Sequence, residues 1–172
     1  MPTATSRDSQ RGLVYAAEDA WAARLDAARR GAPMAQIAGS NVVLPAERRF
    51  GTLAGAQNYA ARVVALPSIV AAVGVLPPPV LRMRRGGRAA HWEPPGTIAV
   101  HVPPHGEPWG LRETTLLHEV AHHVGELGGL CSGHRAPFPA VLLLVVGAVL
   151  GPEAAFALSV SYQRGGVAVG AL

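Results

Sequence analysis

Residues 117–123 read L-H-E-V-A-H-H, and this stretch restricts the fold more than any other part of the chain. His118 and His122 are four residues apart, so on an α-helix both imidazoles lie on one face and can bind one metal ion without bending the helix. Glu119 is offset from them and can reach a metal-bound water as a general base. The stretch therefore predicts a helix over residues 111–124 that presents a metal site.

Three features around the motif favour a metal site over a helix with incidental histidines. A strand predicted at residues 97–102 precedes the helix and could bind an extended peptide along a free edge. Glycines within residues 125–129 are expected to end the helix soon after His122, so that the chain can turn back toward the metal. His134 lies just beyond this turn, and a catalytic zinc ion takes three protein ligands and keeps one position open for water.

The third ligand has several candidates, of which His134 ranks first, Cys131 second and Glu153 third. A thiolate from Cys131 would bind zinc tightly but would quench its Lewis acidity, and Glu153 follows Gly-Pro and is typical of a helix start. Glu126 is too near the motif on the same helix to reach round the ion. Gly128 stands where a related zinc-binding pattern has histidine, and it cannot bind a metal.

The remaining histidines and one tyrosine are assigned structural roles. His123 neighbours His122 but points to another face of the helix. His91 and His105 are interpreted as surface or strand residues, and His101 is the best further candidate because it lies on the strand before the helix. Tyr162 is expected to anchor the last helix to the core rather than to donate a hydrogen bond to an oxyanion.

The rest of the chain predicts an α+β fold with a flexible tail at residues 1–10 and a single domain at residues 11–172. Apolar residues at helical spacing predict helices, and three short stretches joined by tight turns predict an antiparallel meander. Residues 31–51 are interpreted as a polar connection. The expected helices are 13–30, 53–66, 111–124, 137–150 and 152–163, and the expected strands are 80–84, 89–93 and 97–102.

Composition excludes several classes of protein. With 49% hydrophobic and 15% charged residues, the chain is not disordered. The net charge of +4 is carried by scattered arginines without aromatic residues between them, so nucleic acid is only a minor candidate as partner. The single cysteine and the polar N-terminus predict a cytoplasmic protein. The apolar runs 63–76 and 140–150 are too short to cross a membrane.

Several stretches resemble one group of proteins over most of the chain from about residue 11. The similar stretches are W-G-L-R-E-T-T-L-L-H-E-V-A-H-H (109–123), His134 with Phe138 four residues on, L-G-P-E-A-A-F-A-L (150–158), Y-A-A-E-D-A-W (15–21) and G-T-I-A-V-H-V (96–102). The proteins that they resemble are small zinc metallohydrolases of actinobacteria and their phages, similar in layout to the SprT-like and minigluzincin zincins.

The resemblance implies a zincin-like fold with N-terminal helices, a small three-stranded antiparallel sheet, the motif helix and C-terminal helices. It implies His118, His122 and His134 as ligands of Zn²⁺ and Glu119 as general base. The implied activity is zinc-dependent hydrolysis, as a metallopeptidase acting on a peptide or protein. Two alternatives stay open: a non-catalytic binding or regulatory domain stabilised by metal, and a DNA-associated protease of the SprT kind.

Overall fold

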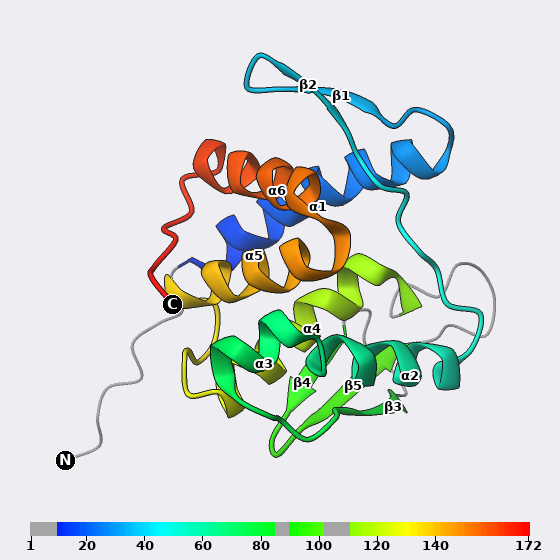
Figure 1. The fold of residues 1–172 in the computed structure, drawn as a ribbon, viewed down its shortest axis with the longest axis vertical. Coiled ribbons are helices and arrows are strands. Elements are labelled where there is room, and N and C mark those ends of the chain that lie inside the picture. Colours follow the sequence, from blue (N-terminus) through cyan, green and yellow to red (C-terminus); the bar gives the residue numbers. More distant parts are fainter. Residues whose placement is uncertain (1–9, 85–89, 102–110) are drawn as a thin grey trace.

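The computed structural model describes residues 10–84, 90–101 and 111–172. Expectations about residues 1–9, the turn at 86–87, the loop 103–110 and His105 therefore lie outside the described residues. Within them the chain is α+β, with helices packed around a small sheet (Figure 1). The elements are α1 (Arg11–Arg29), β1 (Met34–Ile37), β2 (Ser40–Val43), α2 (Leu53–Val64), α3 (Pro67–Val73), β3 (Val80–Arg84), β4 (His91–Glu93), β5 (Thr97–His101), α4 (Glu113–Leu127), α5 (Pro137–Leu150) and α6 (Pro152–Arg164).

Helix α4 lies at the centre of the molecule. Helix α5 packs on one side of it, while α2 and β4 pack on the other. Helix α6 covers α5, and α1 lies against α6, so the helices form successive layers above the sheet (Figure 1). Because α4 is covered on several sides, nearly every residue from Glu113 to Gly125 is buried, rather than a single apolar stripe.

The face of α1 that its apolar spacing predicts is the face that is buried. Trp21 is among the largest fully buried side chains and donates its indole N–H to the backbone oxygen of Ala154 on α6, at 3.0 Å. This bond and the apolar stripe hold α1 on α6, because residues three and four apart lie on one side of a helix. The buried residues are Val14, Ala17, Trp21, Leu25 and Ala28.

The order of the three-stranded sheet differs from the predicted meander. Strand β5 lies in the middle, parallel to β3 and antiparallel to β4. The prediction of an all-antiparallel sheet is therefore wrong. The physical reason is burial: Ile98, Ala99 and Val100 of β5 are fully buried, whereas all three residues of β4 are only partly buried. The most apolar strand takes the central place, where both of its edges are hydrogen-bonded.

The central place of β5 also corrects the prediction that residues 97–102 form an edge strand. Both edges of β5 are occupied by neighbouring strands. The edge strand that packs against α4 is β4. Any extended ligand that added a strand beside the motif helix would therefore pair with β4 and not with β5.

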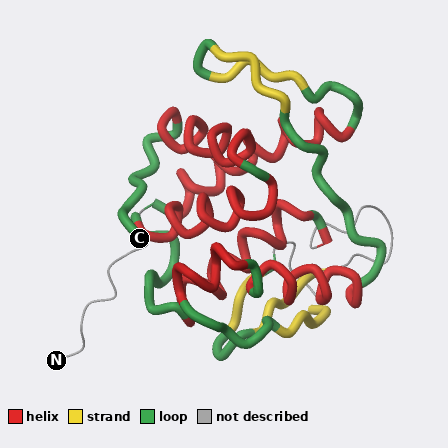
Figure 2. The backbone as a smooth tube through the Cα atoms, viewed as in Figure 1, coloured by secondary structure: helices red, strands yellow, loops and turns green. Residues whose placement is uncertain are grey.

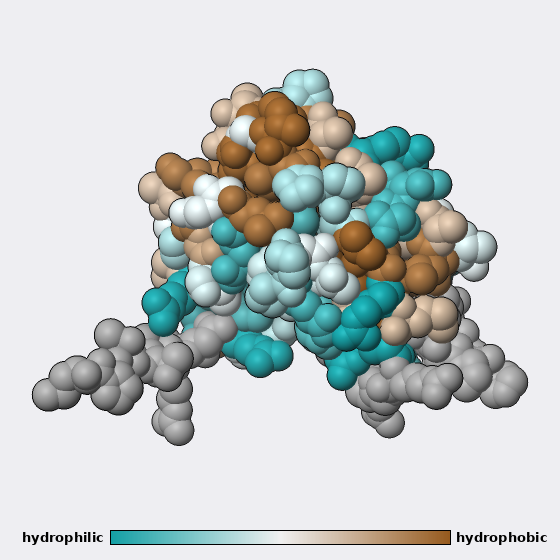
Figure 3. All heavy atoms as spheres, turned by 90° about the horizontal axis from the view of Figure 1, so that it is seen from below, coloured by the Kyte–Doolittle hydropathy of each residue, from teal (hydrophilic) through white to brown (hydrophobic). Residues whose placement is uncertain are grey.

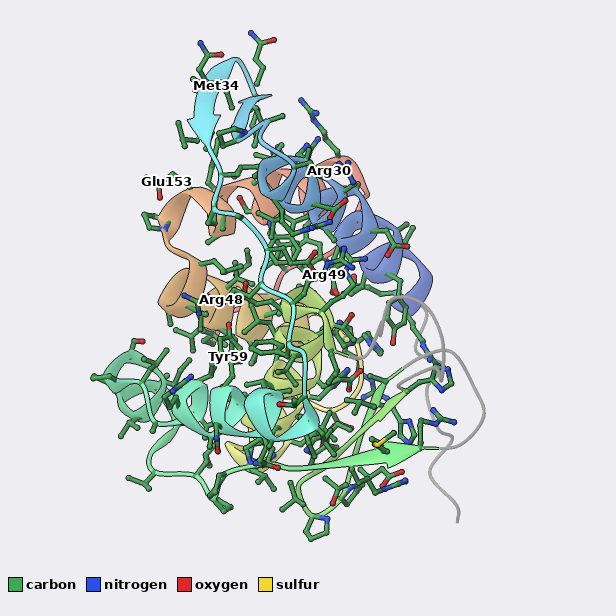
Figure 4. The ribbon with its side chains drawn as sticks, turned by 90° about the vertical axis from the view of Figure 1, so that its right-hand side faces the viewer. Arg30, Met34, Arg48, Arg49, Tyr59 and Glu153 are labelled. Carbon is green, nitrogen blue, oxygen red and sulfur yellow. The ribbon has the colours of Figure 1, made fainter. Side chains whose placement is uncertain are left out.

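A hairpin interrupts the stretch expected to be a connection. Strands β1 and β2 pair through the two-residue turn Ala38–Gly39, in which both residues have positive φ. The hairpin projects from the helices (Figure 2), and Met34, labelled in Figure 4, pairs with Val43 at the end of the hairpin away from its turn. The strands were missed because only Ile37 and Val42 are buried, so there is little alternation to detect, and alanine is an unusual residue at positive φ.

Buried ion pairs fix the start of α4. Glu47 accepts hydrogen bonds from the guanidinium of Arg112 at 2.9 and 3.0 Å and from the Thr114 hydroxyl at 2.6 Å. The fully buried carboxylate of Glu113 accepts from the Tyr59 hydroxyl and from the backbone N–H of Arg48 (Figure 4 labels Tyr59 and Arg48). These contacts set the register of the motif helix, which begins at Glu113 and not at Leu111.

The sequence predicted that Gly125 helps to end α4. This prediction is wrong, because the helix continues to Leu127. The glycine is needed for a close approach, because a Cβ at this position would overlap the sulfur of Cys131. The backbone N–H groups of Leu130 and Cys131 donate to the Gly125 oxygen at 2.8 and 3.2 Å. The chain thus folds back tightly on the helix, with Gly129 at positive φ in the turn.

The surface that carries the sheet mixes apolar and polar areas. In the view from below, apolar side chains gather in patches between hydrophilic ones (Figure 3). Val75, Val80 and Met83, in and next to β3, are among the exposed large hydrophobic residues. No helix in the described part of the chain combines the length and the apolar character needed to cross a membrane.

Candidate metal centre

Three imidazoles meet at one point in the structure. His118 and His122 come from one face of α4, and His134 comes from the loop that follows the helix. The Nε2 atoms of His118 and His122 are 3.2 Å apart, those of His122 and His134 are 3.3 Å apart, and those of His134 and His118 are 3.2 Å apart. The structure therefore brings together the three residues ranked as ligands from the sequence.

This triangle has the dimensions of one face of a metal-centred tetrahedron. With zinc–nitrogen bonds of 2.0–2.1 Å, tetrahedral geometry separates neighbouring ligand nitrogens by about 3.3 Å. An ion bound to all three Nε2 atoms would keep a fourth position on the side away from the triangle. The cluster can therefore hold one metal ion, and among the described residues no fourth histidine, cysteine, aspartate or glutamate joins the group.

A carboxylate on α1 orients the first histidine. Glu18 Oε2 lies 2.7 Å from His118 Nδ1, and Glu18 Oε1 accepts a hydrogen bond from the Tyr162 hydroxyl at 3.1 Å. When Nδ1 donates to Glu18, the Nε2 lone pair of His118 is left to face the cluster. The sequence analysis did not single out Glu18; its only signal was its place in the Y-A-A-E-D-A-W stretch. Tyr162, fully buried, anchors α6 as predicted and does so through Glu18.

The surroundings of the two helical histidines shift their pKa values in opposite directions. Burial alone would lower the pKa of His118, but the charge of Glu18 and its hydrogen bond outweigh burial and raise this pKa. Burial, together with the charges of His118 and His134, lowers the pKa of His122 to about 2. His122 is therefore neutral at physiological pH, and neutral imidazole is the form that binds a metal.

Two aromatic rings form the walls of the cluster. The Tyr15 ring of α1 stacks on His118 with ring centroids 5.2 Å apart, and it lies 5.1 Å from His134. Phe138 of α5 is fully buried and stacks on His122 at 4.2 Å. These contacts restrict the rotation of all three imidazoles. The cluster is thus held by packing as well as by hydrogen bonds, which favours a preorganised site.

Glu119 is buried beside the cluster but is not part of it. Burial raises the pKa of its carboxyl group, while the charge of His118 and a hydrogen bond from the Trp92 backbone oppose this rise. Trp92 belongs to β4, so the carboxylate is oriented by the edge strand of the sheet. A buried carboxylate beside three imidazoles is a candidate proton acceptor.

The loop that carries His134 is fixed at several points. The carboxylate of Glu126 accepts a hydrogen bond from the backbone N–H of Gly133 at 3.2 Å. Gln10, at the start of α1, donates to the backbone oxygens of His134 and Ala168 at 3.1 and 3.0 Å. The third imidazole is therefore held in place by α4, by α1 and by the C-terminal segment.

The other candidates for third ligand lie elsewhere. The Cys131 sulfur packs against Gly125, and burial raises the pKa of its thiol to about 11, helped by the charge of Glu126. Glu153 is exposed in the first turn of α6 (Figure 4). Neither side chain belongs to the group of potential ligands.

The remaining described histidines stabilise strands and loops. His123 is fully buried; its Nδ1 accepts from the Trp92 indole N–H at 3.2 Å and its Nε2 donates to the Pro77 oxygen at 2.8 Å. His91 lies between Arg84 and the Glu93 carboxylate on the sheet. His101, the best further candidate from the sequence, is not in the cluster, and its buried Nδ1 has no hydrogen-bond partner among the described residues.

Comparison with known proteins assigns no family to the chain. No protein-family model, no curated protein and no solved structure matches the chain. The assignment of a function therefore depends on the site itself.

Proposed function

We propose that the protein is a zinc-dependent hydrolase with a zincin-like fold, most simply a metallopeptidase. One observation carries the proposal: the Nε2 atoms of His118, His122 and His134 lie 3.2–3.3 Å apart, in the spacing that a tetrahedral ion needs. Three nitrogen ligands with a fourth position left for water are typical of catalytic zinc, whereas structural zinc takes four protein ligands. The buried Glu119 beside them supplies the general base.

Zinc is the metal that this set of ligands suits. Imidazole nitrogens bind zinc, copper, iron and nickel, and the tetrahedral arrangement favours zinc among them. Bound here, zinc would lower the pKa of a coordinated water from 15.7 toward about 7 and polarise a carbonyl group. Glu18 would keep His118 in the correct tautomer, and Tyr15 and Phe138 would exclude water from the sides of the cluster.

The chemical step assigned to Glu119 is proton transfer. The attacking water forms a bond to the carbonyl carbon of an amide and gives one proton to the Glu119 carboxylate. Glu119 then delivers this proton to the amide nitrogen, the carbon–nitrogen bond breaks, and an amine and a carboxylic acid leave. The hydrogen bond from the Trp92 backbone keeps the carboxylate in one orientation throughout.

The substrate that we propose is a peptide or protein in extended conformation. Strand β4 is the edge of the sheet next to α4, and its Trp92 backbone bonds to Glu119. A peptide paired with this edge would place its amide groups beside the base and the metal. Because the chain has one cysteine and hence no internal disulfide, we assign this activity to the cytoplasm.

Metal content tests the ligand set. We expect the purified wild-type protein to bind one zinc ion, His134→Ala to lose most of this binding, and Cys131→Ala to keep it. If Cys131→Ala lost the metal and His134→Ala kept it, the three-histidine site would be wrong. Four protein ligands with no exchangeable water would instead support the alternative of a non-catalytic, metal-stabilised domain.

Turnover tests the role of Glu119. A Glu119→Gln variant keeps the shape of the side chain but cannot accept a proton, so we expect full metal content and a loss of peptide hydrolysis of about 10²–10⁴-fold. Hydrolysis of a fluorogenic peptide library by the zinc-loaded wild type and variant measures this. Full activity of the metal-loaded variant would contradict the assignment.

A further inference from the structure

The N-terminal helix presents three polar residues to the metal centre. Arg11, Tyr15 and Glu18 are spaced by four and three residues, so they lie along one face of α1. Glu18 bonds to His118, and Tyr15 stacks on the same imidazole. Arg11 continues this row by one turn toward the start of the helix. The row therefore leads from the metal cluster outward to an arginine.

The guanidinium of Arg11 lies over the Tyr15 ring, with its central carbon 5.4 Å from the ring centroid. This cation–π contact and a hydrogen bond between the two side chains hold the planar group, and the guanidinium has further N–H donors beyond that bond. The residue is exposed, and among the described residues no carboxylate forms an ion pair with it.

The two carboxylates nearby already have partners within the site. Glu18 accepts from His118 and Tyr162, and Glu119 accepts from the Trp92 backbone. Neither forms an ion pair with Arg11 within the described residues. A metal ion in the cluster would add positive charge, so this side of the site favours an anionic group on whatever binds there.

The position of Arg11 is fixed by its neighbour. The Gln10 side chain donates to the backbone oxygens of His134 and Ala168, and it accepts from the Ala168 backbone N–H at 2.8 Å. The first turn of α1 is thereby tied to the loop that carries the third ligand. The distance between the Arg11 backbone and the cluster is thus set by the fold.

We propose that Arg11 is a specificity-determining residue that binds a carboxylate of the substrate beside the metal. This inference rests on the proposed hydrolase function and adds a substrate class to it: peptides that carry a carboxylate close to the cleaved bond. A guanidinium presents parallel N–H groups that match the two oxygens of a carboxylate, and the Tyr15 ring orients it for this contact.

Binding of two hydroxamates to the zinc-loaded, full-length protein tests the proposal without turnover. Acetohydroxamate has no charged arm, whereas succinate monohydroxamate carries a carboxylate. A charge-assisted hydrogen bond contributes about 1.5–3 kcal/mol, which corresponds to about tenfold to hundredfold in affinity. We expect calorimetry to show at least about tenfold tighter binding of the charged hydroxamate to the wild type.

The Arg11→Gln variant should lose this preference, binding the charged probe about tenfold more weakly and the neutral probe unchanged. Arg11→Lys keeps the charge without the planar fork and should restore part of the preference. Arg62→Gln is the matched control, since it removes one exposed arginine from α2 and should change neither affinity.

The outcomes separate this proposal from the one on which it rests. Equal binding of both probes to the wild type, or an equal loss of both in Arg11→Gln, overturns the role of Arg11 and leaves the metal site intact. If neither probe binds the zinc-loaded protein, the hydrolase proposal fails, and the substrate class fails with it.

The source of the carboxylate is then found with peptides. If Arg11 binds a chain end, amidation of the C-terminus should raise KM about tenfold in the wild type and not in Arg11→Gln. If it binds an acidic side chain, exchange of aspartate for asparagine should have that effect instead. Some peptides will carry neither a free C-terminus nor an acidic side chain. If the enzyme cleaves these peptides as efficiently as the others, Arg11 binds neither kind of carboxylate.

Discussion

At the scale of the residue, the centre depends on groups that do not belong to the HExxH pattern. Glu18 is a hundred positions away from His118 in the sequence, yet its carboxylate lies 2.7 Å from the imidazole. Tyr162, at the other end of the chain, holds the second oxygen of this carboxylate. A carboxylate bonded to a metal-binding histidine fixes the ring and increases its basicity as a ligand. Glu18 is thus a positioning residue for the proposed metal site.

We expect Glu18→Gln to weaken zinc binding by about 10–100-fold, the usual effect of losing such a partner. Tyr162→Phe should have a smaller effect in the same direction, because Glu18 keeps its bond to His118. Competition with a chromogenic chelator measures both affinities. Asp19→Asn removes a neighbouring exposed charge from α1 and should leave zinc affinity unchanged. Equal effects of the Glu18 and Asp19 variants would show that zinc affinity depends on the overall negative charge of α1 and not on the bond from Glu18 to His118.

The single thiol is expected to react slowly. Burial, aided by the Glu126 charge, raises the pKa of Cys131 to about 11. A raised pKa means that the reactive thiolate is scarce at pH 8 and increases as the pH approaches 11. The rate of alkylation by iodoacetamide in the folded protein should therefore rise steadily between pH 8 and 10, and it should lie below that of a model thiol. A rate that levels off near pH 8.5 would contradict the shift.

At the scale of the element, the return of the chain onto α4 determines whether the third imidazole arrives. The backbone after the helix donates to the Gly125 oxygen, and the Cys131 sulfur occupies the space where a side chain at residue 125 would lie. A small residue on the helix is thus a condition for the position of His134. This dependence links the packing of one turn to the geometry of the metal centre.

We expect Gly125→Ala to destabilise the protein by about 1–3 kcal/mol, because overpacking of a close contact costs energy of this size. The zinc affinity should fall with it, since the loop that carries His134 must move. Urea unfolding and chelator competition measure the two effects. In the double variant Gly125→Ala with Cys131→Gly, the overlap is removed and much of the affinity should return.

Gly12→Ala is a suitable control, because this glycine lies in α1 with nothing near its would-be Cβ, and alanine favours helices by about 1 kcal/mol over glycine. This variant should be as stable as the wild type or more stable, with unchanged zinc affinity. If Gly125→Ala behaved in the same way, the close approach of Cys131 would not be a constraint on the site.

Periodicity predicted five of the six helices among the described residues, missed α3, and predicted the sheet poorly. The buried face of α1 and the bounds of α5 follow from local spacing, as does the start of α6 at Pro152. The order of the strands in the sheet does not follow from local spacing. It depends on which of the three strands is the most apolar, and therefore takes the central place in the sheet. The hairpin at β1 and β2 buries so little that its pattern carries no signal.

The site was predictable where its residues lie close in sequence. Two histidines four residues apart and a third beyond a glycine-rich turn are local features, and the structure brings their Nε2 atoms together. The contacts of Glu18 and Tyr15 with the histidines are not local. They arise because α1 packs on α6 next to the motif helix, and no spacing in one sequence encodes that approach.

At the scale of the whole molecule, the three-histidine cluster joins parts of the chain that are otherwise far apart. Two of its histidines come from α4 and the third from the following loop, and Glu18 and Tyr162 extend the contacts to α1 and α6. An ion that binds only the assembled cluster binds the folded chain and not the unfolded one. Metal binding should therefore stabilise the whole fold.

We expect removal of the metal to lower the thermal midpoint. At a free zinc concentration about 1,000 times the Kd, binding adds about 4 kcal/mol to stability. For a chain of this length, about 1 kcal/mol corresponds to about 2–4 °C, so a chelator should lower Tm by about 10 °C. His122→Ala, which lacks one ligand, should show little further decrease with chelator. Calorimetric scans of both proteins with and without chelator measure this coupling. Equal wild-type midpoints would contradict it, because they would mean that the folded chain binds the metal no better than the unfolded chain.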